Sequence, residues 1–513
     1  MPWRRWRPLL LLALLLAPPL PAGRVALAQE AAAARGGLLG LLPEPVTSRH
    51  ELALAEGPLA YTATAGTLPL RDAKGEVTAA IFHVAYVLDP PDPARPVTFA
   101  FNGGPGAASA FLNLGAIGPR RVLLAPSGAY LPPPARLVDN QESWLAFTDL
   151  VLVDPVGTGY SRSALAEEPT RERFFGVRQD VAAMAAFIRL WLTRSGRTLS
   201  PLFLAGESYG GFRAARLART LPEETGLGVN GILLLSPALD FSLLGEGEGT
   251  VSPLPWVVTL PSLAAVHRQR QQPGGDVRAV PDLADAESFA LGDYLLALAG
   301  GTAAMTPAIE RRVQELTGLA PEVVRNAQGR ISAARFAREY ARAQGRVLSR
   351  YDGMADGPDP SPADPRASGP DPVLDRAMPV WTAAMLGHVA GELGYRTDVS
   401  YRLLDGSISG QWDYGTTPQR QGYAEAMEEL QAGRVLNPAL EVLIAHGDTD
   451  LVTPYLGSRF LLAQQAPLAG AAAVTLRVYP GGHMFYMAEA ARRALQADAR
   501  QLYGRALAAT ERP

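Results

Sequence analysis

One stretch decides the fold of this chain: Leu202-Phe203-Leu204-Ala205-Gly206-Glu207-Ser208-Tyr209-Gly210-Gly211. An apolar run that predicts a buried strand ends at Gly206, a serine follows two positions later, and a helix rich in small residues is expected from Phe212 to Leu221. This order is typical of a nucleophile elbow, a strained strand-to-helix turn that exposes the hydroxyl of Ser208. Gly206 and Gly210 flank the serine because a side chain at either position would collide with the neighbouring strand or helix. A serine hydroxyl needs a base to remove its proton, so the stretch also predicts a histidine and an acid further along the chain.

Strands and helices alternate around the elbow. Buried strands are expected at Leu150–Val153, Leu202–Ala205, Ile232–Leu235, Leu440–Ala445 and Val474–Tyr479, with a helix at Val177–Thr193. Upstream, strand-like runs separated by turn residues lie at Leu59–Ala65, Val77–Leu88 and Val97–Phe101. Alternation of this kind builds a mostly parallel central sheet flanked by helices. The sequence therefore predicts an α/β fold.

The segment from 245 to 430 differs in character from the rest of the chain. Strand runs vanish there, and helical periods appear at Ala284–Ala299, Pro307–Leu316, Ser332–Ala343 and Met378–Leu393. We expect a helical cap inserted into an α/β core of residues 51–244 and 431–513. Residues 29–50 are expected to be a loose N-terminal segment, and residues 352–371, which are dense in Pro, Gly and Asp, a flexible loop within the insertion.

An acid and a histidine follow two of the late strands. Leu440–Ala445 is followed by His446-Gly447-Asp448-Thr449-Asp450, and Val474–Tyr479 by Pro480-Gly481-Gly482-His483. The carboxyl ends of parallel strands share one edge of the sheet, where ligands bind. The chain order Ser208, Asp450, His483 is that of the α/β-hydrolases, which is the fold we expect. Asp450 is preferred as the triad acid, while Asp448 is interpreted as a turn former.

A glycine-rich loop offers donors for the oxyanion of acyl transfer. Phe101-Asn102-Gly103-Gly104-Pro105-Gly106 follows an early strand. The expected donors are the N–H groups of Gly104 and Tyr209, the residue directly after the nucleophile. A plain glycine turn is the alternative reading. The loop has no G-K-[ST] continuation, which argues against a nucleotide.

Composition excludes several classes of function. The chain has 513 residues, a formal net charge of -3 and no cysteine, so disulfides, thiolate metal sites and thiol nucleophiles are excluded. Its six histidines show no HExxH spacing, and we expect no metal site and no cofactor. Lys and Arg form no dense cluster, which argues against nucleic acid or an anionic membrane as main partner. The sequence does not indicate an oligomeric state.

The first 28 residues are interpreted as a signal peptide. A charged start, Trp3–Arg7, precedes the apolar run Leu9–Ala17, and Ala26-Leu27-Ala28 offers the small residues preferred at a cleavage site. We expect cleavage after Ala28, export to the periplasm or the medium, and no stable membrane anchor afterwards. An uncleaved anchor is the alternative.

Five motifs resemble those of the serine carboxypeptidase family. They are Asn102-Gly103-Gly104-Pro105-Gly106, Asp154-Pro155-Val156-Gly157-Thr158-Gly159-Tyr160-Ser161, Gly206-Glu207-Ser208-Tyr209-Gly210-Gly211, Gly447-Asp448-Thr449-Asp450 and Gly482-His483-Met484. They occur in the family's order, and the chain is identified as a divergent, bacterial-type member without cysteines. The resemblance implies a peptide substrate, release of C-terminal residues through a Ser208 acyl-enzyme, and a helical cap over the cleft.

The resemblance also implies how a substrate is held. Asn102, the Gly103 N–H and a protonated Glu207 would bind the free carboxylate of the last residue, which gives the family its preference for acid conditions. Met484 would line the pocket for the departing residue.

Two positions depart from the family's pattern. Ala100 stands where the family has tryptophan, and Ala116 where it has a second glutamate. Because of these departures, an esterase or acyltransferase of the same fold is the alternative function. A third hypothesis is a non-catalytic binding protein whose ligand occupies the cleft.

Overall fold

The computed structural model describes residues 37–244, 251–272, 279–364, 369–415 and 424–510. The predicted signal peptide and its cleavage site therefore lie outside the described residues. Among the helices of the described residues, none is both long and apolar enough to cross a membrane.

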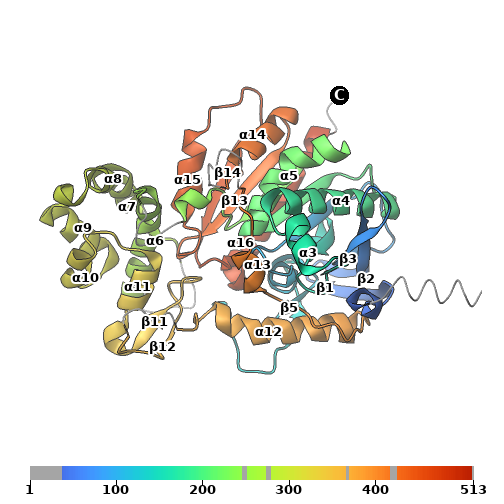
Figure 1. The fold of residues 1–513 in the computed structure, drawn as a ribbon, viewed down its shortest axis with the longest axis horizontal. Coiled ribbons are helices and arrows are strands. Elements are labelled where there is room, and N and C mark those ends of the chain that lie inside the picture. Colours follow the sequence, from blue (N-terminus) through green and yellow to red (C-terminus); the bar gives the residue numbers. More distant parts are fainter. Residues whose placement is uncertain (1–36, 245–250, 273–278, 365–368, 416–423, 511–513) are drawn as a thin grey trace, which may run out of the picture.

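A single large sheet forms the centre of the molecule (Figure 1). Within the described residues it has ten strands, in the order β1-β2-β3-β7-β4-β9-β10-β13-β14, with β8 paired to β3. From β7 to β14 all neighbours are parallel, whereas β1, β2 and β3 are antiparallel to their neighbours. The strands are β1 (Val46–Leu54), β2 (Gly57–Arg71), β3 (Val77–Leu88), β4 (Val97–Phe101), β7 (Asp149–Val153), β8 (Arg162–Ser163), β9 (Leu202–Glu207), β10 (Gly231–Leu235), β13 (Glu441–Gly447) and β14 (Val474–Tyr479).

Helices cover both faces of this sheet. Helices α4, α5 and α14 pack with one face in a common apolar cluster, and α12 and α16 pack with the other. Strands β4, β7, β9 and β10 are buried along their whole length, which is why they read as continuous apolar runs. The helices of this part are α2 (Ala110–Leu112), α3 (Glu167–Phe174), α4 (Val177–Ser195), α5 (Tyr209–Thr225), α12 (Leu374–Leu386), α13 (Gly406–Gly410), α14 (Met427–Leu436), α15 (Tyr455–Gln464) and α16 (Glu489–Thr510).

A second group of helices extends to one side of the sheet (Figure 1). They are α6 (Leu254–Gln271), α7 (Ala284–Phe289), α8 (Leu295–Ala299), α9 (Pro307–Thr317), α10 (Pro321–Asn326) and α11 (Ala333–Glu339). They bury an apolar cluster of their own, which α15 joins through Tyr455 and Leu456. A short hairpin follows, built from β11 (Arg346–Leu348) and β12 (Asp356–Pro358).

The expected α/β-hydrolase architecture is confirmed. The predicted strands Val77–Leu88, Val97–Phe101 and Val474–Tyr479 have the observed bounds, and the other predicted strands agree within a few residues except β2, which is longer at both ends. Three features differ from expectation. Strand β1 begins at Val46, within the segment 29–50 expected to be loose. The hairpin strand β12 lies within the segment expected to be a flexible loop, and α12 packs on the sheet rather than with α6–α11.

Candidate active site

Ser208 lies at the turn between β9 and α5. Its backbone has φ 57° and ψ -123°, a conformation that residues with a side chain rarely adopt. The turn is tied to the next strand because the Ser208 N–H donates to the carbonyl of Leu235 at 2.9 Å. A Cβ at Gly206 would lie 2.0 Å from the carbonyl oxygen of Gly210, so glycine is required there. The turn presents Ser208 partly exposed, whereas its neighbours in sequence are buried.

Asp450 and His483 form a buried hydrogen-bonded pair. His483 Nδ1 lies 2.9 Å from Asp450 Oδ2. The other carboxylate oxygen, Oδ1, accepts the N–H groups of Val452 at 2.8 Å and Thr453 at 3.0 Å. Burial opposes ionisation of Asp450, but the charge of His483 and these hydrogen bonds hold the pKa of Asp450 below its usual value. Burial also opposes the charge of His483, and the Asp450 carboxylate outweighs it and raises the pKa of His483.

The loop after β10 connects Ser208 to this pair through two of its residues. Ser236 Oγ donates to the His483 carbonyl at 2.8 Å, and the Ala238 N–H donates to the Ser208 carbonyl at 3.3 Å. In the described part of the chain no hydrogen bond joins Ser208 Oγ to His483. Such bonds are often long in ligand-free sites and shorten when substrate binds.

The glycine loop after β4 lies directly against the elbow. A Cβ at Gly103 would lie 2.6 Å from the Tyr209 nitrogen and 2.8 Å from Ser208 Cβ, so only glycine permits this approach. Gly104 has φ 102°, which also favours glycine. The loop thus brings the backbone of Gly103 beside the N–H of Tyr209.

A buried ion pair between Arg213 and Asp180 is hydrogen-bonded to the same glycine loop. Arg213 on α5 donates to the Asn102 carbonyl at 3.0 Å and to both carboxylate oxygens of Asp180, at 2.7 Å and 3.1 Å. Its guanidinium also lies 5.3 Å from the ring centre of Tyr209. Arg213 thus joins the glycine loop to the residue that follows the nucleophile.

Glu207, which directly precedes Ser208, lies in a buried polar cluster. Its Oε2 accepts hydrogen bonds from Asn102 Nδ2 and, at 2.8 Å, from the Tyr486 hydroxyl. Asn102 is oriented by the Leu112 N–H, which donates to its Oδ1 at 2.9 Å. Burial raises the pKa of Glu207 to about 7, although His483 and the two donors act in the opposite direction. Below about pH 7 Glu207 is therefore protonated in the site as it stands, without a neighbouring substrate carboxylate.

Tyr486 is a site residue that sequence reasoning did not single out. It lies 279 positions from Glu207 in the chain, and the signal available was its place just after His483. Its ring lies close to Gly115, where a Cβ would be 3.1 Å from it. Ala116 is buried in the same turn and offers no carboxyl group, and Ala100 is buried within β4.

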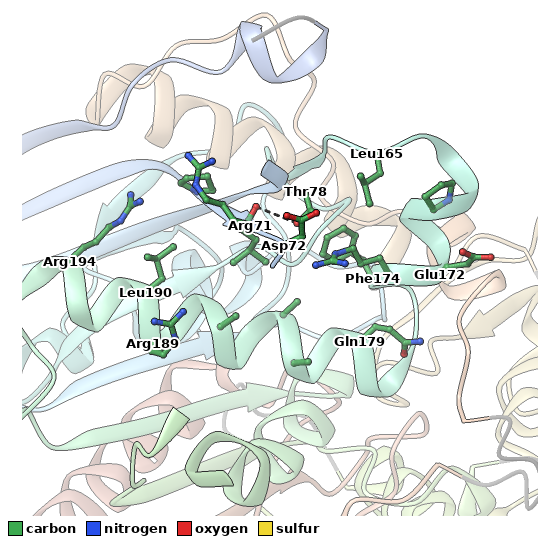
Figure 2. Close-up of a pocket in the computed structure, with 17 residues that line it drawn as sticks. Arg71, Asp72, Thr78, Leu165, Glu172, Phe174, Gln179, Arg189, Leu190 and Arg194 are labelled. Atoms are coloured by element: carbon green, nitrogen blue, oxygen red, sulfur yellow. Dashed lines mark hydrogen bonds between the residues drawn. The ribbon is translucent and has the colours of Figure 1, made fainter. Parts of the chain in front are cut away.

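Met484 lines a cavity of about 130 Å³ next to His483. Tyr130 and Tyr351 contribute aromatic walls, and Arg376 lines it from α12. A larger pocket of about 880 Å³ lies elsewhere, between the end of β2 and helix α4 (Figure 2). Its lining includes Arg71, Asp72 and Leu190 but none of the candidate site residues. Among the described residues no group of three or more Asp, Glu or His side chains could hold a metal ion.

Comparison with known proteins agrees with this geometry. The sequence model of the serine carboxypeptidase family matches residues 58–239, which include the glycine loop and the elbow. Residues 58–239 are therefore similar in sequence to the serine carboxypeptidase family. A serine carboxypeptidase-like protein of Arabidopsis thaliana is 28% identical over 157 residues, covering 29% of this chain and 31% of that protein. A pheromone-processing carboxypeptidase of Yarrowia lipolytica is 32% identical over 142 residues, covering 27% of this chain and 21% of that protein.

The match to these serine carboxypeptidases thus spans less than a third of their own length. A prohormone-processing carboxypeptidase of Saccharomyces cerevisiae has the same fold, with a TM-score of 0.55 at 15% identity, over 86% of this chain and 91% of that one. The fold is therefore shared along most of the chain, while the family's sequence model matches residues 58–239, the part that holds Ser208.

Proposed function

We propose that the protein is a serine carboxypeptidase-like hydrolase that releases C-terminal residues from peptides. The observation that carries the proposal is the strained Ser208 turn together with the buried His483–Asp450 hydrogen bond, at loops following β9, β13 and β14. These groups have the roles required for nucleophilic acyl transfer. The family match over residues 58–239 supports a carboxypeptidase.

In the proposed reaction Ser208 Oγ attacks the last peptide carbonyl while His483 Nε2 takes the hydroxyl proton. The N–H groups of Gly104 and Tyr209 stabilise the oxyanion. His483 passes the proton to the leaving amine as the C–N bond breaks, which leaves an acyl-enzyme on Ser208. Water then attacks the ester, gives its proton to His483, and the proton returns to Ser208 as the shortened peptide leaves. Asp450 stabilises the imidazolium in both halves.

Recognition of the substrate's terminus is assigned to Asn102, the Gly103 N–H and neutral Glu207. The pKa of about 7 for Glu207 supports this assignment, because a protonated carboxyl donates a hydrogen bond to a carboxylate where an ionised one would repel it. Met484 is assigned to the pocket of the departing residue, since it lines the cavity beside His483.

A second candidate function is an esterase or acyltransferase of the same fold. Ala116 favours it, since this buried position supplies no second carboxyl for the terminus of a peptide. Such an enzyme would use the same triad but would not require a free carboxylate.

The decisive experiment follows a mixed peptide pool by mass spectrometry. We expect residues to leave one by one from the C-terminus, and Ser208→Ala to abolish release, while Ser195→Ala, at an exposed serine, behaves as wild type. Matched peptides with a free carboxylate, an amide or an ester at the terminus separate the two candidates. Hydrolysis of the ester alone would favour the esterase, and equal release of residues from all three would contradict a carboxypeptidase. Failure of Ser208 to react with a fluorophosphonate would favour a non-catalytic binding protein.

We also propose that the protein is exported, to the periplasm or the medium, and that α6–α11 form a cap over the cleft. The signal-like features of residues 1–28 support export. N-terminal sequencing of the exported protein should begin at Gln29. A protein that retains Met1 in the cytoplasm would refute the export proposal.

A further inference from the structure

The tip of the β11–β12 hairpin lies between the loops that carry the catalytic acid and base. The tip is the segment Ser349–Ala355, and its ends are joined by the Ser349 N–H, which donates to the Ala355 carbonyl at 2.9 Å. The hairpin belongs to the insertion between β10 and β13 and is distant in sequence from both loops. The proposed mechanism uses none of its residues.

On one side the tip is bonded to the residues that flank Asp450. The Leu451 N–H donates to the Arg350 carbonyl at 3.0 Å, and the Gly353 N–H donates to the Thr449 carbonyl at 3.1 Å. The Thr449 hydroxyl also donates to Asp352 Oδ1 at 2.8 Å. Asp450 is therefore fixed through its neighbours on both sides.

On the other side the tip is bonded to the base itself. The His483 N–H donates to the Tyr351 carbonyl at 2.6 Å, and the two rings meet edge to face, 5.3 Å apart at 90°. The approach is so close that a Cβ on Gly482 would lie 2.0 Å from the Tyr351 carbonyl oxygen. The Tyr351 ring therefore packs against the His483 imidazole, and the Tyr351 carbonyl accepts a hydrogen bond from the His483 backbone N–H.

The tip is itself held from two directions. The Ser349 hydroxyl donates to Asp371 at 2.6 Å, and Asp371 also accepts the Arg350 N–H at 2.9 Å. From α6, Arg270 donates to the carbonyls of Gly353 and Met354 at 3.2 Å and 3.0 Å. A segment anchored in this way can impose its position on the loops that it touches.

We infer that Tyr351 is a positioning residue, which sets the placement of the His483 imidazole toward Ser208 while Asp352 and Arg350 set that of the Asp450 loop. The inference rests on the proposed function, because it concerns the same triad. Productive geometry at such a site has a tolerance well below 1 Å, and losing it costs about tenfold to a hundredfold in rate.

The test compares Tyr351→Ala with Tyr351→Phe. Both keep the backbone carbonyl, but only Phe keeps the ring against the imidazole. The readout is the rate of Ser208 labelling by diisopropyl fluorophosphate, whose small leaving group does not need the cavity that Tyr351 also lines. We expect labelling to slow about tenfold or more in Tyr351→Ala, and Tyr351→Phe to restore it to within about twofold. The downfield NMR signal of the His483 Nδ1–H should broaden in the Ala variant only.

Thr449→Val provides a second arm if Tyr351→Ala does not fold. It removes the hydroxyl bonded to Asp352 and leaves Asp450 and His483 unchanged. We expect labelling to slow about threefold, with KM for peptides unaltered, because one hydrogen bond to the Asp352 carboxylate is lost. If the wild type labels and both variants label at its rate, the positioning role is refuted and the proposed function stands. If the wild type itself does not label, the proposed function fails first.

Discussion

Replacing Glu207 by glutamine should remove a pH dependence of stability that the wild type has. Glu207 has a pKa of about 7 in the folded protein, against an ordinary value of 4.5, because it is buried. Between these values the folded state keeps a proton that the unfolded state has lost, so stability falls as pH rises through this window. At 1.36 kcal/mol per pKa unit the loss amounts to about 3 kcal/mol, complete above pH 7 and absent below pH 4.5.

Glutamine is the appropriate substitute because it mimics the neutral form. Its oxygen can accept from Asn102 and Tyr486 as Glu207 Oε2 does, and it does not titrate. Urea unfolding, followed by tryptophan fluorescence from pH 4.5 to 8, gives the free energy of unfolding of both proteins. Between pH 4.5 and 8, the free energy of unfolding of the glutamine variant should rise by about 3 kcal/mol relative to that of the wild type.

The comparison is controlled in two ways. The pKa of Asp154 is also raised by burial, to about 7, so it adds its own slope, which is present in both proteins and cancels in the difference. Glu167→Gln, at an exposed carboxylate on α3, should show no such gain. Curves for wild type and Glu207→Gln that run parallel over the whole range would refute the reasoning that burial keeps Glu207 protonated.

The proton on Glu207 should also appear in the kinetics. For a peptide with a free carboxylate, kcat/KM of the wild type should decline above pH 7, because ionised Glu207 would face the substrate's charge. The decline should be missing in Glu207→Gln and for ester substrates. At lower pH, kcat/KM should fall as His483 becomes protonated, at a pH set by its raised pKa. This fall should be the same for the wild type, for Glu207→Gln and for ester substrates.

Three further substitutions test the framework of the site. Asp450→Asn should lower kcat by roughly 10³ to 10⁴, since the imidazole loses the partner of its Nδ1–H, with KM nearly unchanged in steady-state assays. Asp180→Ala should cost about 3–5 kcal/mol in thermal or urea unfolding, because it leaves Arg213 charged and buried without its carboxylate. Gly103→Ala should lower kcat by about 10² to 10³, since its Cβ displaces the oxyanion loop, while Gly504→Ala, where nothing lies within 4 Å, should leave kcat unaltered. A fully active Gly103→Ala enzyme would place the oxyanion donors elsewhere.

The sheet and the order of the catalytic groups could be predicted from the sequence because each signal is local. Buried parallel strands are uninterrupted apolar runs, and the glycines around Ser208 mark a turn that no other residue fits. The same reasoning missed β1, whose nine residues include Thr, Ser, Arg, His and Glu and only one buried side chain, Leu52. It also missed α6, which is buried on nearly all sides from Pro255 to Val266 and therefore has no polar stripe to reveal its period.

What lay beyond prediction is the set of contacts between distant segments. The bond from Tyr486 to Glu207 and the contact of Tyr351 with His483 depend on loops that only the folded chain brings together. A family motif predicts which residues carry the chemistry, whereas these contacts between distant segments follow only from the fold.

On the inference that Tyr351 positions His483, the insertion takes part in the proposed chemistry. The strands of the core bring Ser208, Asp450 and His483 to one edge of the sheet, yet a strand end fixes only where a loop begins. Beyond that point the Asp450 loop is held by α6, where Gln269 donates to Asp448, and by the hairpin tip. Without the insertion, the core would still carry Ser208, Asp450 and His483 in the same chain order. It would lose the hydrogen bonds from α6 and from the hairpin tip to the loops of Asp450 and His483. Changes in the insertion should consequently alter the rate of the proposed reaction as well as its substrate preference.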